Sequence, residues 1–289
     1  MKVSECFKTR PVISFEIFPP RPNAKQPAID KFYESLDTLA SLKPAYISIT
    51  YGAGGGTSSE EKTIALAKFI KEHYGIEPVI HLPAVAFNKE TMIEFLDKLA
   101  AAHVENVLAL RGDKPKVDNG NHDFTYATDL VDVIKARGDY YILGACHPDI
   151  HPESANAVED TKHLKEKVDA GVSQLVSQLF FDNQHFYNFI ERCELAGIDV
   201  PIQAGIMPVI NQRQIEKMAT MGGVELPPKF LKIMDRYKDN PVAMRDAGIA
   251  YAVDQIVDLL AEGVDGIHLY TMDNPVVTKR ICEAIRAMV

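Results

Sequence analysis

The stretch VISFEIFPPRP, residues 12–22, is an apolar, β-branched and aromatic run that stops at two prolines. Side chains of these kinds pack well on a pleated sheet, so the run predicts a buried strand. Glu16 is the exception inside it, because a buried ionised carboxylate is costly unless it is paired or neutralised. The first strand therefore raises the question of what this acid does.

Seven further runs of the same kind follow along the chain, at residues 45–51, 78–83, 106–112, 141–146, 174–181, 201–207 and 265–271. Between them apolar residues recur at helical spacing, as at Phe186, Phe189 and Cys193. Eight strands that alternate with helices predict a parallel sheet closed as a (β/α)8 barrel, or TIM barrel. The connection from Asn211 to about Val264 is long enough to predict an extra helical segment before the last strand. A doubly wound open sheet is the structural alternative.

Length and composition fit one such barrel as a single domain over residues 1–289. The net charge of −9 argues against nonspecific binding to nucleic acid or to an anionic membrane. No segment approaches the ~18 apolar residues of a membrane span, and the N-terminus lacks the apolar core of a signal peptide. The four cysteines form no CxxC pair, which predicts reduced thiols in a cytoplasmic protein.

Polar side chains stand at the carboxyl ends of seven of the eight predicted strands. In (β/α)8 barrels the active site lies at this end and in the loops that follow. One such side chain alone is readily explained as a structural group, but the whole set predicts a ligand-binding mouth. The set is Glu16, Thr50, Tyr51, His81, Arg111, Asp113, His147, His151, Gln178 and Tyr270.

The loop TYGAGGGTSSEEKT, residues 50–63, has the glycine content of a phosphate-binding loop but fits neither common template. It has no Gly-Lys pair, and Thr57 stands where a third glycine is needed. Glu60 and Glu61 would also repel a phosphate. The glycines permit close approach to a flat ligand, and a flexible turn explains them equally well.

Two other loops carry clustered polar residues. GACHPDIHPES, residues 144–154, suggests a metal site, but Pro148 disfavours the helix on which HxxxH spacing binds a metal, and we expect none. LALRGDKP, residues 108–115, holds Arg111 and Asp113, either as a surface ion pair or as a donor and an acceptor for a ligand. A carboxylate beside a redox cofactor would tune its potential.

Taken together in their order, eight segments make the sequence resemble the methylenetetrahydrofolate reductase family, in its bacterial single-domain form. The resemblance runs from about Ile13 to the C-terminus. The segments are SFEIFPPR, ISITYGAGG, HLPA, LALRGD, HPDIHPES, LKEKVDAGVSQLVSQLFFD, AGIMPV and HLYTM.

The resemblance implies a (β/α)8 barrel with non-covalently bound FAD, usually in a homo-oligomer. The implied reaction reduces 5,10-methylenetetrahydrofolate to 5-methyltetrahydrofolate in two half-reactions. NAD(P)H first reduces the flavin and leaves, and the folate then takes its place and accepts the hydride. Whether NADH, NADPH or a reduced protein is the donor stays open, as do the oligomer number and the folate polyglutamate preference.

The resemblance also implies roles for individual residues. Glu16 matches the catalytic acid and Asp113 a catalytic carboxylate near the N1–C2 edge of the flavin. The positions that match FAD contacts are Thr50, Tyr51, Ala53, His81, Leu110, Arg111, Gly112, Asp113, Tyr126, Ala127, His147, His151, Ser154, Asp160 and Lys167. The positions that match substrate contacts are Glu16, Gln178, Gln214, Met218 and Tyr270. No metal ligands are implied.

Four positions depart from the family's pattern. His147 stands in place of a tyrosine near the flavin, and Met218 in place of a phenylalanine that lies against substrate. Asn274 stands where an arginine would meet the glutamate tail of the folate, and Lys279 or Arg280 is a conjectural substitute. Glu166 occupies a position that is arginine in a relative.

We expect Glu16 to protonate N10 of the folate as the methylene bridge opens to an N5 iminium ion. A general acid must hold its proton near neutral pH, and burial favours the protonated form of a carboxyl group. The alternatives are another FAD barrel, such as one that oxidises proline, a metal-dependent barrel hydrolase or lyase, and a non-catalytic subunit that binds flavin or folate.

Overall fold

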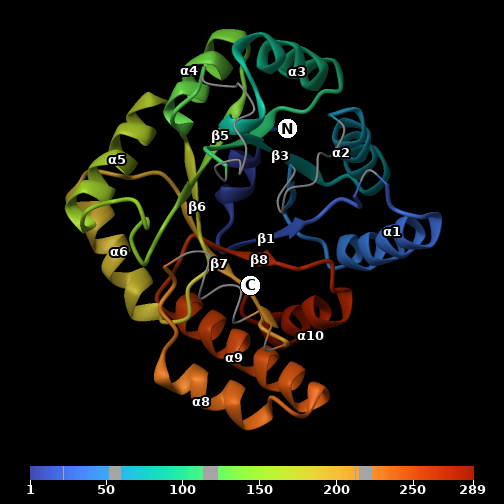
Figure 1. Ribbon diagram of the computed structural model, residues 1–289, viewed down its shortest axis with the longest axis vertical. Helices are drawn as coiled ribbons and strands as arrows, with labels where there is room; N and C mark the ends of the chain where they lie inside the picture. The colour runs from blue at the N-terminus through green and yellow to red at the C-terminus, as the bar shows by residue number, and fades with distance from the viewer. Residues whose placement is uncertain (22, 52–59, 113–122, 212, 215–222) are drawn as a thin grey trace.

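The computed structural model describes residues 1–289 except 22, 52–59, 113–122, 212 and 215–222 (Figure 1). Eight parallel strands close into one barrel in chain order, with helices around them (Figure 1). The strands are β1 (Val12–Ile17), β2 (Tyr46–Ile49), β3 (Glu77–Pro83), β4 (Asn106–Leu110), β5 (Tyr141–Cys146), β6 (Gln174–Ser177), β7 (Ile202–Ile206) and β8 (Gly266–Tyr270). The predicted (β/α)8 barrel is confirmed, and the open sheet is excluded.

Closure of the barrel pairs the first strand with the last. In the register of β1 and β8, Ser14 is opposite His268 and Glu16 is opposite Tyr270. On the other side of β1, Glu16 is opposite Ser48 of β2. These pairings bring polar residues from the two ends of the chain to one place.

The helices occupy the connections between strands. They are η1 (Val3–Lys8), α1 (Gln26–Ser41), α2 (Glu60–Tyr74), η2 (Ala84–Ala86), α3 (Lys89–Ala101), α4 (Ala127–Arg137), α5 (Ala157–Ala170), α6 (Asn183–Leu195), α8 (Pro228–Tyr237), α9 (Pro241–Ala261) and α10 (Pro275–Ile285). None of the helices in the described part of the chain is long and apolar enough to cross a lipid bilayer.

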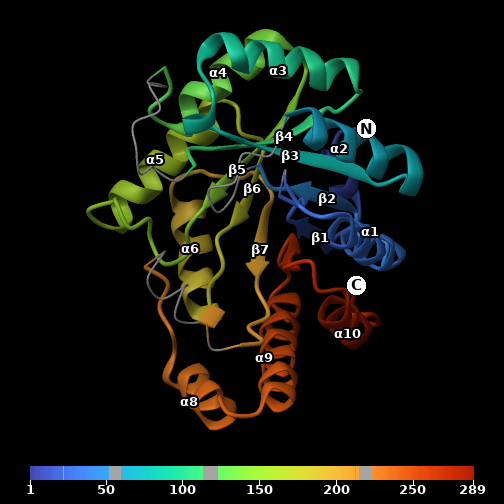
Figure 2. The same cartoon turned by 45° about the vertical axis from the view of Figure 1, so that its right-hand side comes forward.

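The long seventh connection contains two described helices, α8 and α9, so the predicted extra helical segment is confirmed. Figure 2 shows α8 beside the end of α9, away from the strands. Phe230 of α8 packs edge-on against Tyr251 of α9, with ring centroids 5.1 Å apart. The extra helix is therefore held by a small apolar cluster of its own.

The sixth strand is shorter than the sequence predicts. It ends at Ser177, whereas the apolar run continues to residue 181. Phe180 stacks on Phe186 with centroids 5.1 Å apart, and Phe181 stacks on Phe230 at 4.4 Å. Packing under the surrounding helices, and not strand pairing, explains why these residues are apolar.

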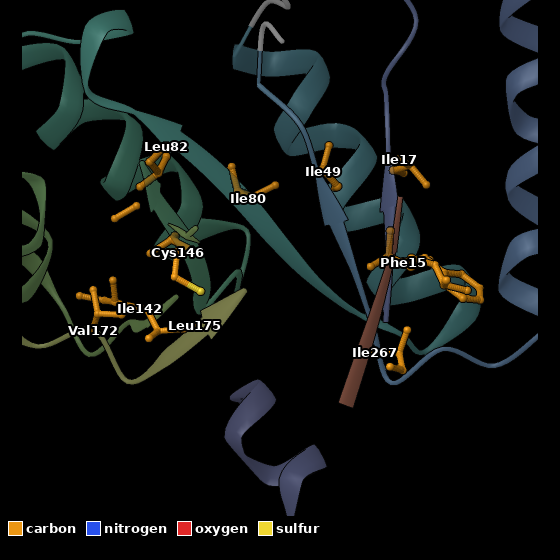
Figure 3. Packing of buried hydrophobic residues seen from close by; sticks show 14 of the residues in the cluster. Phe15, Ile17, Ile49, Ile80, Leu82, Ile142, Cys146, Val172, Leu175 and Ile267 are labelled. Carbon is orange, nitrogen blue, oxygen red and sulfur yellow. The ribbon is translucent and has the colours of Figure 1, made fainter. Parts of the chain in front are cut away.

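The outward faces of the strands pack against the helices in one large apolar cluster. Figure 3 shows part of it, with side chains from six of the strands gathered between sheet and helices. Phe15 and Ile17 of β1 are fully buried there. The other labelled members are Ile49, Ile80, Leu82, Ile142, Cys146, Val172, Leu175 and Ile267.

The inward faces differ between the two ends of the barrel. Near the amino ends of the strands, Val3 and Phe7 of η1 pack against inward apolar residues such as Tyr46 and Leu143. The backbone N–H of Val3 also donates to Asn106 Oδ1 at 2.8 Å. η1 therefore closes this end of the barrel, and Glu16 lies toward the opposite end.

Candidate functional site

Glu16 lies inside the barrel near the carboxyl ends of the strands, with 8% of its surface exposed. Its Oε2 atom is 3.6 Å from His81 Nε2 and 3.8 Å from His268 Nε2. The alternation of β1 explains this placement, because Phe15 and Ile17 face the helices while Ser14 and Glu16 face the interior. The acid is thus set between two imidazoles in a place that excludes bulk water.

His81 has a buried ring nitrogen available to a ligand. Burial lowers the pKa of His81, and its proximity to Glu16 opposes that effect. The ring is therefore neutral, and its Nε2 atom has no hydrogen-bond partner among the described residues. Buried polar atoms are almost always paired, so an unpaired one at the mouth of a barrel indicates a contact made by a bound molecule.

A second part of the mouth is cationic and is built from β4, β5 and α5. Burial, together with nearby His151, Lys167 and Arg111, lowers the pKa of His147 to about 3. Burial and Arg111 also lower the pKa of His151. Two neutral imidazoles beside two cations form a site for an anion that needs both charge and neutral hydrogen-bond partners.

The hydrogen bonds of this cationic part hold its side chains in place. Lys167 Nζ donates to the Ala145 carbonyl at 2.8 Å, and Ser154 Oγ donates to Asp160 Oδ1 at 2.9 Å. The guanidinium of Arg111 donates to both carboxylate oxygens of Glu153, at 2.5 and 3.1 Å. An anion at Arg111 would share or replace this exposed pair.

Gly112, directly after Arg111, can only be glycine in this backbone. Its φ is +82°, which side chains disfavour. A Cβ atom there would lie 2.7 Å from Val85 Cγ2 and 2.9 Å from Pro83 Cβ. The sharp turn after β4 places Arg111 beside the loop that follows β5.

Other predicted cofactor contacts are spread along the same side of the barrel. Thr50 is 4% and Ala127 7% exposed, Leu110 is partly exposed, and Tyr126 is 62% exposed. The ring of Tyr51 packs against Phe87 and Phe95, and burial raises its pKa to about 12. Ala53, Asp113 and Met218 lie outside the described residues.

The predicted substrate contacts that are described lie at or near the ends of β6, β7 and β8. Gln178 is exposed just after β6, and Tyr270 Oη donates to the Ser177 carbonyl at 2.7 Å. Gln214 is partly buried, and its Oε1 accepts from the backbone N–H of Ile210 at 3.1 Å. Gln178 and Tyr270 thus flank one edge of the mouth, whereas the described bonds of Gln214 are local.

Lys279 and Arg280, the conjectural substitutes for the arginine missing at Asn274, each have an acidic neighbour in the structure. Both lie on α10, where Lys279 pairs with Glu283 at 3.9 Å and Arg280 with Asp246 at 2.5 Å. The side chain of Asn274 instead caps α10 by accepting from Val277 N at 3.2 Å. Glu166 is exposed on α5.

Sequence reasoning missed the polar network beneath Glu16. It consists of inward-facing residues of five strands: Ser14, Tyr46, Ser48, Gln174, Gln203 and His268, each 2% exposed or less. The missed signal is the alternation of the strands themselves. His268 is two residues before Tyr270, which was already assigned to the mouth, so it faces the same interior.

Asp273 was also missed, although it lies close to the catalytic candidate. Its Oδ1 accepts from the backbone N–H of Phe18 at 3.0 Å, which ties the loop after β8 to the end of β1. Burial raises the pKa of Asp273, the hydrogen bond from Phe18 opposes this, and the charge of Glu16 adds to it; the net pKa is about 6. Its φ of 52° is one that aspartate tolerates better than most residues.

The described residues contain no group of three or more histidine, cysteine or acidic side chains placed to hold a metal ion. What the geometry defines is a barrel whose mouth combines a buried acid, an unpaired imidazole nitrogen and a cationic flank. This is the arrangement of a site for an organic ligand with an anionic part.

Comparison with known proteins identifies the family. The model of the family described as methylenetetrahydrofolate reductase matches residues 2–286, so the chain belongs to this family. It is 36% identical to 5,10-methylenetetrahydrofolate reductase of Pectobacterium carotovorum over 94% of this chain and 89% of that protein. Its identity to the Escherichia coli protein of the same name is 35%, over 94% of this chain and 90% of the relative.

More distant similarities cover part of a longer protein or the fold alone. Methylenetetrahydrofolate reductase (NADH) 1 of Arabidopsis thaliana is 33% identical over 94% of this chain but only 49% of its own length. An uncharacterised Clostridium thermocellum protein, described as binding two copies of 5-methyl-5,6,7,8-tetrahydrofolic acid, superposes with a TM-score of 0.65 at 11% identity. That match covers 99% of both chains and shows a shared barrel fold.

Proposed function

We propose that this chain reduces 5,10-methylenetetrahydrofolate to 5-methyltetrahydrofolate, with NAD(P)H as the donor and FAD as the cofactor, in a ping-pong reaction. Family membership supports the reaction class. The observation that carries the proposal for this chain is Glu16, an acid 8% exposed at the mouth of the barrel. A buried carboxyl group that can reach a ligand is the group that a proton-donating mechanism requires.

The described residues fit FAD as the cofactor. Lys167 and Arg111 supply positive charge for a diphosphate, with His147 and His151 as neutral neighbours. His81 Nε2 is the buried unpaired atom that a flavin contact would satisfy. FAD, when bound, would supply a group that accepts a hydride from the nicotinamide and passes it to the folate.

Glu16 is the proposed general acid of the folate half-reaction. Its O–H bond breaks as an N–H bond forms at N10 of the folate, and the N10–methylene bond opens to an N5 iminium ion. The positive charge then lies on the substrate and the negative charge on Glu16. Asp113, which we propose as a second carboxylate near the reacting ring, would favour the same cation.

The remaining residues are proposed to bind and orient. Gln178, Gln214, Met218 and Tyr270 are assigned to the substrate. The set assigned to FAD contains Thr50, Tyr51, Ala53, His81, Leu110, Arg111, Gly112, Asp113, Tyr126, Ala127, His147, His151, Ser154, Asp160 and Lys167. For the described residues, each assignment rests on the family resemblance together with the position given above. The assignments of Ala53, Asp113 and Met218 rest on the family resemblance alone.

We further propose a cytoplasmic homo-oligomer of single-domain barrels that binds neither nucleic acid nor membrane. The net charge of −9 supports the lack of affinity for anionic polymers. All four cysteines are described, and all four are free thiols, as expected in a reducing compartment.

The visible spectrum of the purified protein is the first test. We expect a yellow protein whose flavin absorbance is bleached by NADH or NADPH without oxygen and restored by methylenetetrahydrofolate. A colourless protein that loses activity on chelation would favour a metal-dependent hydrolase or lyase. A flavin that proline bleaches and nicotinamides do not would favour the proline-oxidising alternative. Bound flavin that neither proline nor a nicotinamide reduces would favour the non-catalytic alternative.

A further inference from the structure

The polar network below Glu16 fixes which nitrogen of His268 carries the proton. Gln203 is the starting point, because its amide can be oriented in only one way. Its Nε2 lies 3.2 Å from the Val12 carbonyl and 3.4 Å from the Ile267 carbonyl, both of which can only accept. Its Oε1 accepts from Tyr46 Oη and from Gln174 Nε2, the latter at 2.8 Å.

The orientation of Gln203 determines the hydroxyl of Ser14. Gln203 Nε2 donates to Ser14 Oγ at 3.0 Å, so this oxygen acts as an acceptor. The same oxygen is 2.7 Å from Nδ1 of His268. If Nδ1 carried a proton, the hydroxyl hydrogen of fully buried Ser14 would be left with Tyr46 Oη, which already accepts from Gln174 Nε2 at 3.1 Å and donates to Gln203 Oε1. Ser14 therefore donates to Nδ1.

With Nδ1 as an acceptor, the ring proton of His268 is on Nε2. That N–H group faces Ser48 Oγ at 3.3 Å and Glu16 Oε2 at 3.8 Å. A shift of about an ångström would bring Nε2 within ordinary hydrogen-bond distance of the carboxylate. His268 is 1% exposed, so this donor competes little with water.

We propose that His268 is a positioning residue, held by Ser14 and Gln203 with its proton on Nε2, and that it stabilises the carboxylate of Glu16 when Glu16 gives up its proton. The inference rests on the proposed function and deepens it. A charge that develops inside a barrel is stabilised most by a donor already aimed at it, because nothing has to reorganise. The Nε2–H group of His268 is part of the protein, so it is in place before any ligand binds.

The other groups that face Glu16 do not provide such a donor. His81, from β3, has no described partner that fixes the proton on Nε2. Tyr270 of β8 already donates its hydroxyl to the Ser177 carbonyl. Asp273, after β8, carries negative charge when ionised and would oppose a second carboxylate. His268 is thus the donor that the surrounding network has preset.

The first test reads the protonated nitrogen directly and does not depend on any activity. Long-range ¹H–¹⁵N correlation of the ¹⁵N-labelled wild-type protein distinguishes the two histidine tautomers, and comparison with His268→Gln assigns the signal. We expect the pattern of a ring protonated on Nε2. In Ser14→Ala, the Nδ1 position loses its donor, and a shift toward the other tautomer should follow. A wild-type ring protonated on Nδ1 would overturn the proposal.

The second test uses two substitutions of His268, each of which can replace a different one of its two ring nitrogens. His268→Gln can place an amide nitrogen near the Nε2 position, whereas His268→Asn reaches only the Nδ1 position. We expect methylenetetrahydrofolate to reoxidise the reduced His268→Asn protein about 10- to 100-fold more slowly than wild type, with partial rescue in His268→Gln. His163→Asn, an exposed histidine on α5, is the matched control and should stay within about twofold of wild type.

The two sets of outcomes separate this inference from the proposed function. If wild-type protein is not reoxidised by methylenetetrahydrofolate, the proposed function fails, and with it the role of His268 in that reaction. If wild type reacts but His268→Asn reacts equally fast, only the role of His268 is overturned. Failure of His268→Asn to fold leaves the decision to the tautomer of wild type and Ser14→Ala.

Discussion

The outward and inward faces of the same strands carry different side chains in this barrel and have different roles. On β1, Phe15 and Ile17 face the helices and are fully buried among apolar side chains, while Ser14 and Glu16 face the axis among histidine, serine and glutamine. Most barrels of this type fill their interior with branched apolar residues. Here the outward face supplies stability, and the inward face keeps a hydrogen-bonded polar network under the mouth.

The outward face should give the largest loss of stability. Phe15→Ala removes a fully buried ring between sheet and helices and leaves a cavity. We expect the free energy of unfolding to fall by about 3–5 kcal/mol, measured by chemical denaturation. Folded variant protein should retain the wild-type ratio of the two half-reaction rates. A change in that ratio with little loss of stability would contradict the division between the faces.

The ionisation of Asp273 should have the next largest effect on the free energy of unfolding, and only above about pH 4. Burial raises the pKa of Asp273 from 3.8 to about 6, so the folded state holds this proton more tightly than the unfolded state. Stability is therefore lost as the pH rises from about 4 to about 6 and stays lower above that range. The shift corresponds to at most about 3 kcal/mol.

Asp273→Asn tests this cost and keeps the acceptor for the N–H of Phe18. The variant should unfold at higher denaturant concentration than wild type at pH 8, and the difference should vanish at pH 4. Equal differences at both pH values would show that the ionisation of Asp273 is not the cause.

Within the polar network, removal of the Tyr46 hydroxyl should give the smallest loss in the free energy of unfolding. Tyr46→Phe removes a donor to Gln203 Oε1, but Gln174 Nε2 still donates to that atom at 2.8 Å. We expect a loss of about 1–2 kcal/mol in denaturant unfolding. The His268 tautomer should be unchanged in the NMR spectrum, because the orientation of Gln203 is retained. A changed tautomer would mean that Tyr46, and not the backbone carbonyls, orients the amide.

The barrel itself was predictable from the sequence because strand alternation and helical spacing are local signals. The end of β6 was not, since Phe180 and Phe181 are apolar for packing with Phe186 and Phe230, which the local pattern does not reveal. The mouth was predictable as a set of residues at strand ends. Which of them meet was not, because closure pairs Glu16 with His268 across 252 positions of chain.

The tautomer-setting network was beyond sequence reasoning for a related reason. Ser14, Gln203 and His268 are ordinary residues in their own strands, and each has a structural explanation alone. Only the register of β1 with β8 and β7 with β8 brings them together. The conjecture that Lys279 or Arg280 replaces a missing arginine stays a prediction; in the structure both cations lie beside acidic neighbours, which the sequence pattern did not reveal.

The central claim is that Glu16 is the acid of a flavin-dependent folate reduction, and Glu16→Gln tests it most directly. The two half-reactions are followed separately by stopped-flow absorbance of the flavin without oxygen. We predict that the variant binds FAD and is bleached by NAD(P)H, but that methylenetetrahydrofolate reoxidises it at least about 100-fold more slowly than wild type. Reoxidation of Glu16→Gln by methylenetetrahydrofolate at the wild-type rate would contradict the account.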